Sequence, residues 1–250
     1  MTEDCAISSD EVLFDNILDK EIQKTFLPFN TIQWLFFMPK YEIYNNFLFY
    51  NRPLVNVLSF FSVTLVISLA FYRTLIWYSL SDTVFKISII SDFIFYCLGF
   101  MITYFLNICC RKVNVELVLN IQRIIKISKL KEKNFASYTI ISWLEFGAMF
   151  FYYVTFILFY YTTFKIPILN GLMLLLIMHF DMNIISARRI ITLIDINLNL
   201  WISELTYSMS ELSSVKNDVN SIRLLRMYKQ ILETYDNYKQ AFQILVNCGL

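Results

Sequence analysis

Residues 170–201 read NGLMLLLIMHFDMNIISARRIITLIDINLNLW. The first half of this stretch is apolar enough to cross a bilayer. The second half, which starts at Arg188 and Arg189, places apolar residues on one helical side and polar residues on the other. One helix that leaves the membrane and continues as an amphipathic helix accounts for both halves. The stretch therefore predicts an all-α polytopic membrane protein, in which long amphipathic helices extend from the membrane into the cytosol.

The composition agrees with a membrane protein. Of 250 residues, 57% are hydrophobic and only 16% are charged, whereas a soluble domain has about 25% charged residues. The net charge of +1 and the lack of a basic stretch interleaved with aromatics predict no nucleic-acid partner. The five cysteines form no CxxC pair, so we expect no metal site and no cofactor.

Four apolar windows reach the length of about 20 residues that a membrane helix needs. They cover residues 54–72, 87–110, 139–161 and 166–187. If alternate connecting segments share a side, 18 Lys and Arg residues lie on the side of both termini and three on the other. The positive-inside rule then places both termini in the cytosol. We expect a cytosolic N-terminal segment, a four-helix transmembrane bundle and a cytosolic helical region, at residues 1–53, 54–187 and 188–250.

The expected spans contain four ionisable residues, which in membranes normally face protein or water. One of them, His179, is the only histidine of the chain, and Asp181 follows two positions later. Residues two apart on a helix point about 200° away from each other, so this pair cannot bind one ligand or metal. We predict buried polar contacts between helices for Glu145, His179 and Asp181, no catalytic residue and no enzyme activity.

Aromatic residues on the faces of Asp92 and Glu145 outline a cavity in the outer half of the bundle. If Glu145 points inward, helical spacing turns the aromatics seven, eleven and fifteen positions later the same way and turns Phe150 and Tyr153 elsewhere. Such a lining suits a small, partly apolar ligand, although helix packing alone also explains each aromatic stripe. The predicted ligand contacts are Asp92, Tyr96, Tyr152, Phe156, Tyr160 and Asn170.

The C-terminal segment carries a heptad seam. Apolar residues recur there at alternating steps of four and three over three heptads, the pattern of a helix built to pack against another helix. Packing within the same subunit and contact with another subunit explain the seam equally well. Its members are Leu224, Tyr228, Ile231, Tyr235, Tyr238, Phe242 and Leu245.

Three stretches together resemble insect gustatory receptors, most closely the bitter-type members of moths and butterflies. They are FLPFNTIQWLFFMPKYEI at 26–43, ARRIITLIDINLNL at 187–200 and YKQILETYDNYKQAFQILVNCGL at 228–250. The resemblance implies seven membrane helices, a cytosolic N-terminus and a ligand pocket among the early helices. It also implies a tetrameric cation channel of the plasma membrane, with a pore lined by the last helix and a cytosolic anchor where the subunits meet.

Under this resemblance the chain is a taste receptor subunit that gates cations in response to small tastants. The Thr-Tyr to Gln-Phe pattern of the family's seventh helix has no match here, so the resemblance covers about three fifths of a receptor and does not supply a pore. Leu250 lies at the end of an apolar run without a cap, and we expect a truncated gene model or a short form. The alternative is a truncated four-span subunit that interacts with full-length receptors and regulates them as a homo- or hetero-oligomer.

Overall fold

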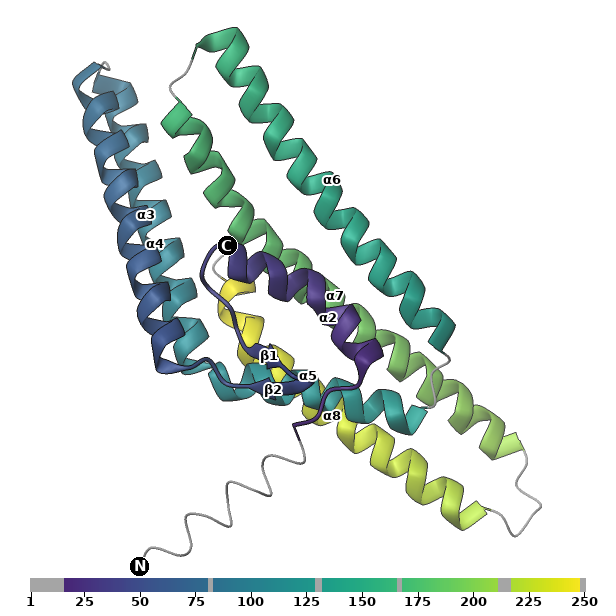
Figure 1. Ribbon diagram of the computed structural model, residues 1–250. Helices are drawn as coiled ribbons and strands as arrows, with labels where there is room; N and C mark the ends of the chain where they lie inside the picture. Colours follow the sequence, from purple (N-terminus) through teal and green to yellow (C-terminus); the bar gives the residue numbers. More distant parts are fainter. Residues whose placement is uncertain (1–15, 81–82, 129–131, 166–167, 211–216, 248–250) are drawn as a thin grey trace, which may run out of the picture.

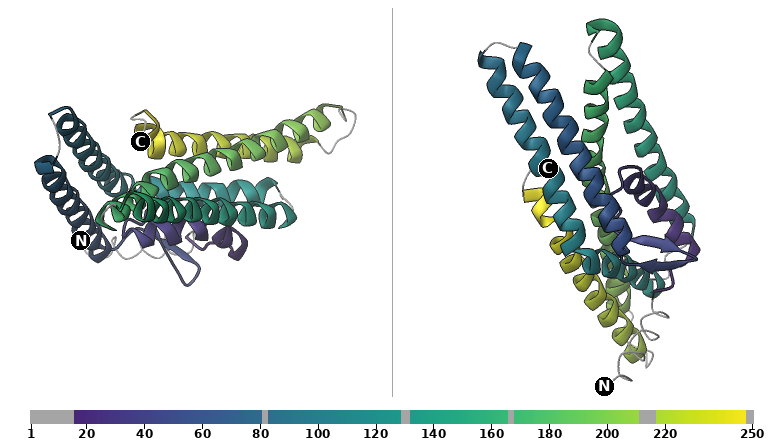
Figure 2. Two further views of the ribbon diagram at one scale, coloured as in Figure 1. Left: turned by 90° about the horizontal axis from the view of Figure 1, so that it is seen from above. Right: turned by 60° about the vertical axis from the view of Figure 1, so that its left-hand side comes forward.

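The structure, a computed structural model, describes residues 16–80, 83–128, 132–165, 168–210 and 217–247 (Figure 1). Across these residues the chain forms seven helices and one small β-hairpin. Two long helical hairpins rise side by side from a base of further helices, and their far ends separate (Figures 1 and 2). We call two places the distal ends. One is where α3 (Pro53–Leu80) meets α4 (Thr83–Cys109), and the other is where α6 (Glu132–Phe164) meets α7 (Ile168–Ser210).

Three of these helices are long and apolar enough to cross a membrane. The apolar stretches are Pro53–Ser79 in α3 (Pro53–Leu80), Phe85–Cys109 in α4 (Thr83–Cys109) and Ser137–Thr163 in α6 (Glu132–Phe164). Within their most apolar windows only 28%, 22% and 11% of the residues are buried by the rest of the chain. Because so many apolar side chains face outward, these helices need lipid or further protein around them. Three candidate membrane-spanning helices suggest a multi-pass membrane protein.

The helix α7 (Ile168–Ser210) is continuous over 43 residues, a length of about 65 Å at 1.5 Å per residue. This confirms that one helix contains both halves of the stretch around Arg189. The fourth expected span, 166–187, falls in the first half of α7. Residues 166–167 and several side chains there lie outside the described residues, so this span stays a prediction.

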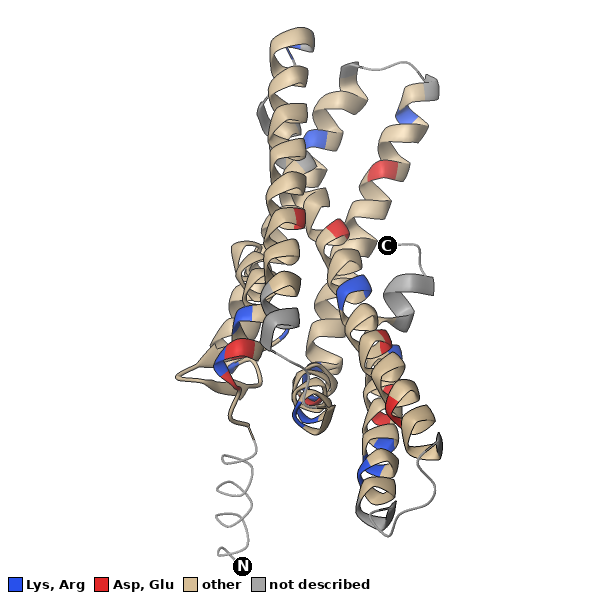
Figure 3. Cartoon of the chain, turned by 90° about the vertical axis from the view of Figure 1, so that its right-hand side faces the viewer, with Lys and Arg blue, Asp and Glu red and all other residues tan. Residues whose placement is uncertain are grey.

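The base of the molecule, which we call the helical body, contains the largest hydrophobic core. It consists of α2 (Lys20–Leu35), the hairpin of β1 (Glu42–Tyr44) and β2 (Phe47–Phe49), α5 (Arg111–Ser128), α7 beyond Ala187, and α8 (Asn217–Asn247). Charged residues gather in this body, while long stretches of the rising helices carry none (Figure 3). The body is therefore the part of the chain suited to water.

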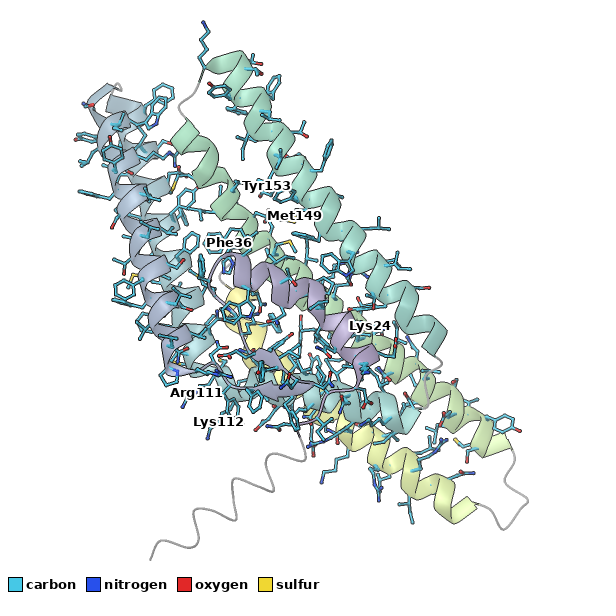
Figure 4. All side chains as sticks on the ribbon, viewed as in Figure 1. Lys24, Phe36, Arg111, Lys112, Met149 and Tyr153 are labelled. Carbon is cyan, nitrogen blue, oxygen red and sulfur yellow. The ribbon has the colours of Figure 1, made fainter. Side chains whose placement is uncertain are left out.

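The helix α5 lies across the lower end of the two hairpins and packs against α7 and α8 (Figure 1). Val115, Val118 and Ile121 place one apolar side in the core. This basic stretch was expected to form a connecting loop, so the helix is an addition to the prediction. Its charged residues lie on the opposite side, where Arg111 and Lys112 project from the corner between α4 and α5 (Figure 4).

The β-hairpin was also not predicted. Its turn places Asn45 and Asn46 at φ 50° and 66°, the left-handed region that a two-residue type I′ turn requires and that asparagine tolerates. Gln122 of α5 holds the segment before α2 in place, since its Nε2 donates to the Ile17 carbonyl at 2.7 Å and its Oε1 accepts from the Asp19 N–H at 2.9 Å. Residues 17–19 are thus held against α5.

Candidate functional site

Two polar residues of α7 point to different neighbours. His179 is buried among aromatic rings, 5.3 Å from Phe36 and 5.9 Å from Phe100 between ring centroids, and its Nε2 lies 3.2 Å from Nδ2 of Asn183. Asp181 faces α6 instead and accepts a hydrogen bond there. The structure thus separates the two side chains, as their two-residue spacing predicts.

Two polar clasps tie α6 to α7. In the upper clasp, the Tyr153 hydroxyl donates to Oδ2 of Asp181 at 2.5 Å. In the lower clasp, Arg189 forms a two-bond pair with Glu145: Nε to Oε2 at 2.7 Å and Nη2 to Oε1 at 2.5 Å. Charge-assisted and bidentate hydrogen bonds of this kind are short and directional. They fix the register of the two helices at two levels.

The lower clasp has a further support from Tyr138. Its hydroxyl donates to the Arg189 carbonyl at 2.6 Å, and its ring lies 5.3 Å from the guanidinium carbon of the same residue. Above the clasps, Ile157 lies close to Gly171. A Cβ at position 171 would lie 2.7 Å from Cγ2 of Ile157, so only glycine allows this approach between α6 and α7.

The predicted orientation of α6 is wrong by one position. Tyr153, expected to point away from the bundle, is 8% exposed, whereas Tyr152, expected to point inward, is 61% exposed. Figure 4 shows Tyr153 and Met149 between α6 and α7. Glu145 lies at the edge of the buried face and its long side chain reaches sideways to Arg189. Its position therefore does not mark the centre of that face.

The predicted ligand contacts fall into two groups. On α4, Tyr96 is buried with Met173 of α7 in one hydrophobic cluster, and the exposed Asp92 pairs with Nη1 of Arg73 at 3.2 Å. On α6 three rings form a ladder: Tyr152 and Phe156 are 6.0 Å apart between ring centroids, and Phe156 and Tyr160 are 4.5 Å apart. The Asn170 side chain lies outside the described residues. Ligand binding by these residues stays a prediction.

The heptad seam packs largely within its own chain. Ile231 and Phe242 are buried in the core of the helical body, Leu224 is buried as well, and Tyr238 is half-buried. Tyr228 and Tyr235 are exposed, and the side chain of Leu245 lies outside the described residues. Packing within the subunit therefore explains the buried members. The exposed tyrosines form, with Leu225 and Leu232, an apolar strip that we call the α8 stripe.

One residue that sequence reasoning missed is Lys40, which follows α2. It is 5% exposed, and its Nζ has no hydrogen-bond partner among the described residues. The Phe242 ring centroid lies 4.0 Å from Nζ. Burial lowers the pKa of Lys40 to about 7, and burial also raises the pKa of the adjacent Tyr41 above its usual range. A cation–π contact contributes about 2 kcal/mol, less than the several kcal/mol that burying an ammonium costs.

The sequence signal for this lysine is slight: a single cation at the end of the run FFMPK.

Within the described part of the chain, no three His, Cys, Asp or Glu residues are grouped so that they could hold a metal ion. Comparisons with protein-family models, with curated proteins and with solved structures find no match to this chain.

Proposed function

We propose that this chain is the ligand-sensing part of an insect gustatory receptor, a plasma-membrane chemoreceptor that gates cations in response to small tastants. The first half of α7 is then the fourth membrane span, the helical body is cytosolic, and the distal ends face outside. Two features support this arrangement: the outward-facing apolar side chains of α3, α4 and α6 and the 18-to-three division of basic residues.

The observation that carries the proposal is the continuity of α7. Its first half packs against α4 and is clasped to α6, and its second half is built into the core with α5 and α8. Because packed helices move as units, a ligand that changes the spacing of the distal ends would shift α7 and with it the helical body. A membrane receptor needs such a connection between its two sides.

The aromatic ladder on α6 supplies a surface for a tastant. Tyr152, Phe156 and Tyr160 present ring faces and two hydroxyl groups along one flank of the helix. Small ligand sites combine mostly apolar walls with a few polar groups, and stacked rings add about 0.5–1.5 kcal/mol beyond area burial. The ladder thus suits partly aromatic, weakly polar compounds, the chemistry of many bitter substances.

The test is a chimeric receptor in which residues 1–250 replace the matching part of a full-length gustatory receptor. Cells that express the chimera and a calcium indicator are exposed to bitter compounds and sugars. We expect at least one compound to cause calcium entry through the chimera although it causes none through the parent receptor. The chain alone should give none, because nothing in it matches the family's pore helix. A robust tastant-gated current from the 250-residue chain alone would contradict the proposal.

The alternative function is an interaction subunit that regulates full-length receptors. The α8 stripe favours it, since Leu225, Tyr228, Leu232 and Tyr235 are exposed in a region that we place outside the membrane. Co-expression separates the two functions: a regulator lowers the response of a full-length receptor, and Leu232→Glu cancels that effect. Glu233→Gln, on the neighbouring exposed position, serves as the control. If co-expression leaves the response unchanged at equal surface levels, the alternative fails.

A further inference from the structure

We propose that the small cavity beside Lys40 binds one monatomic inorganic anion, with chloride as the physiological occupant. The proposal concerns the helical body and is independent of any tastant site. It rests on three observations: a buried cation without a hydrogen-bond partner among the described residues, a cavity of matching size, and amide groups in the cavity wall.

The cavity lies where the end of α2, α5, α7 and α8 meet. Its wall includes Gln33, Lys40, Asn114, Ser186 and Phe242. The volume is about 20 Å³, enough for one water-sized particle. Phosphate, sulfate and carboxylate ligands are too large, whereas a single chloride or a water molecule fits.

The wall offers N–H donors toward such a particle. Oε1 of Gln33 accepts the backbone N–H of Lys40 at 3.1 Å, so the NH₂ end of this carboxamide is the end left to donate. Asn114 carries a second buried carboxamide. The Ser186 hydroxyl donates its proton to the Met182 carbonyl at 2.7 Å, so it does not donate to the cavity. The ammonium and two amide groups together form a donor set for an anion.

No carboxylate appears among the described residues that line the cavity. The titratable neighbours of Lys40 on the packed elements are Tyr41, Cys110 of the α4–α5 corner and His179 of α7. None of these groups is an anion at neutral pH in its ordinary state. A buried ammonium without a counter-ion either loses its proton or acquires an anion. Burial lowers the pKa of Lys40 and so favours the first outcome, whereas an anion bound beside Nζ would raise that pKa again.

The Phe242 ring occupies only one side of the ammonium, at 4.0 Å from its centroid. The remaining N–H groups are therefore available to the cavity. An anion there would join the segment after α2 through Lys40 to α5 through Asn114, and by keeping Lys40 charged it would strengthen the contact of Lys40 with Phe242 of α8. Chloride binding should accordingly stabilise the packing of α8 on the body.

The test is the chloride dependence of thermal unfolding, with the full chain in nanodiscs of zwitterionic lipid. Tryptophan fluorescence gives Tm while chloride rises from about 10 to 300 mM at constant ionic strength, balanced with gluconate, which is too large for the cavity. For a Kd on the order of 10 mM, Tm should rise by roughly 4 °C. Bromide should act like chloride, and sulfate should not.

Two variants make the test specific. Lys40→Met keeps the shape of the side chain and should abolish the chloride-dependent rise, whereas Lys112→Met, at an exposed lysine, should retain it. Asn114→Leu keeps Lys40 and should weaken the binding of chloride at least fivefold. Bromide should also give an anomalous scattering peak beside Nζ of Lys40 in crystals of the unaltered chain. The proposal is overturned if the Tm of the wild-type chain does not change with chloride, as expected for a cavity that holds only water. It is also overturned if the Tm of Lys40→Met rises with chloride as much as that of the wild type.

Discussion

Removing one hydroxyl group from Tyr153 should loosen the pairing of α6 with α7. Tyr153 is nearly buried, and its hydroxyl donates to Asp181 at 2.5 Å. A hydrogen bond to a charged group contributes about 1.5–3 kcal/mol, but bonds between membrane helices average about 0.6 and reach about 1.7 kcal/mol. Because Asp181 is only half-buried, we expect Tyr153→Phe to cost about 1 kcal/mol. That cost lowers Tm by roughly 2–4 °C in a chain of this size.

The assay is thermal unfolding of the chain in nanodiscs, with Tyr152→Phe as the matched control. That variant loses the same atom one position earlier, on an exposed side chain, and should stay within about 0.5 kcal/mol of wild type. Combined with Asp181→Ala, Tyr153→Phe should add little, since both remove the same bond. If Tyr152→Phe proves as harmful as Tyr153→Phe, the orientation of α6 given by the upper clasp is wrong.

Three further predictions concern the lower clasp, Lys40 and the membrane orientation. Glu145→Gln leaves the guanidinium of Arg189 without its anion. Because the Arg189 side chain is 12% exposed, the loss should destabilise the fold by about 2 kcal/mol, a cost between those of breaking an exposed and a fully buried ion pair. In a denaturant titration Arg188→Met, an exposed neighbour, should cost almost nothing, and a cost equal to that of Glu145→Gln would refute the clasp. In chloride-free buffer, the free energy of unfolding should rise between about pH 7 and 10.5, because in this range the unfolded chain keeps the Lys40 proton that the folded chain has released. Lys40→Met should lose this dependence on pH. An unchanged dependence in that variant would contradict the burial of Lys40. Antibody tags at either terminus should react only in permeabilised cells, so labelling of intact cells would reverse the orientation.

The features that follow from helical spacing alone could be predicted from the sequence. The continuity of α7 follows from its amphipathic second half, and the opposite directions of His179 and Asp181 follow from their two-residue spacing. The distinction between Tyr152 and Tyr153 could not be made in this way. The two positions differ by 100° on the helix, and Glu145, used as the marker, lies at the edge of the interface.

Features that depend on distant segments were missed. The helix α5 carries an amphipathic pattern, but its basic residues also fit a cytosolic loop, and only its packing against α7 and α8 makes one side a core. Lys40 becomes buried because Phe242, some two hundred positions later, covers it. The seam residues Leu224 and Ile231 were recognised as packing positions, but a heptad pattern does not say which helix they contact.

Direct binding of tastants to the purified chain tests the central claim, that these residues form the sensing part of a taste receptor. A panel of bitter compounds is titrated against the chain in nanodiscs by isothermal calorimetry. At least one compound should bind saturably with a Kd of roughly 1 μM to 1 mM. Phe156→Ala, in the middle of the aromatic ladder, should weaken it at least tenfold at equal Tm. Phe151→Ala, at an aromatic side chain of α6 that is 72% exposed, should change it less than about threefold. Absence of saturable binding across the panel, or an equal loss in both variants, would contradict the account.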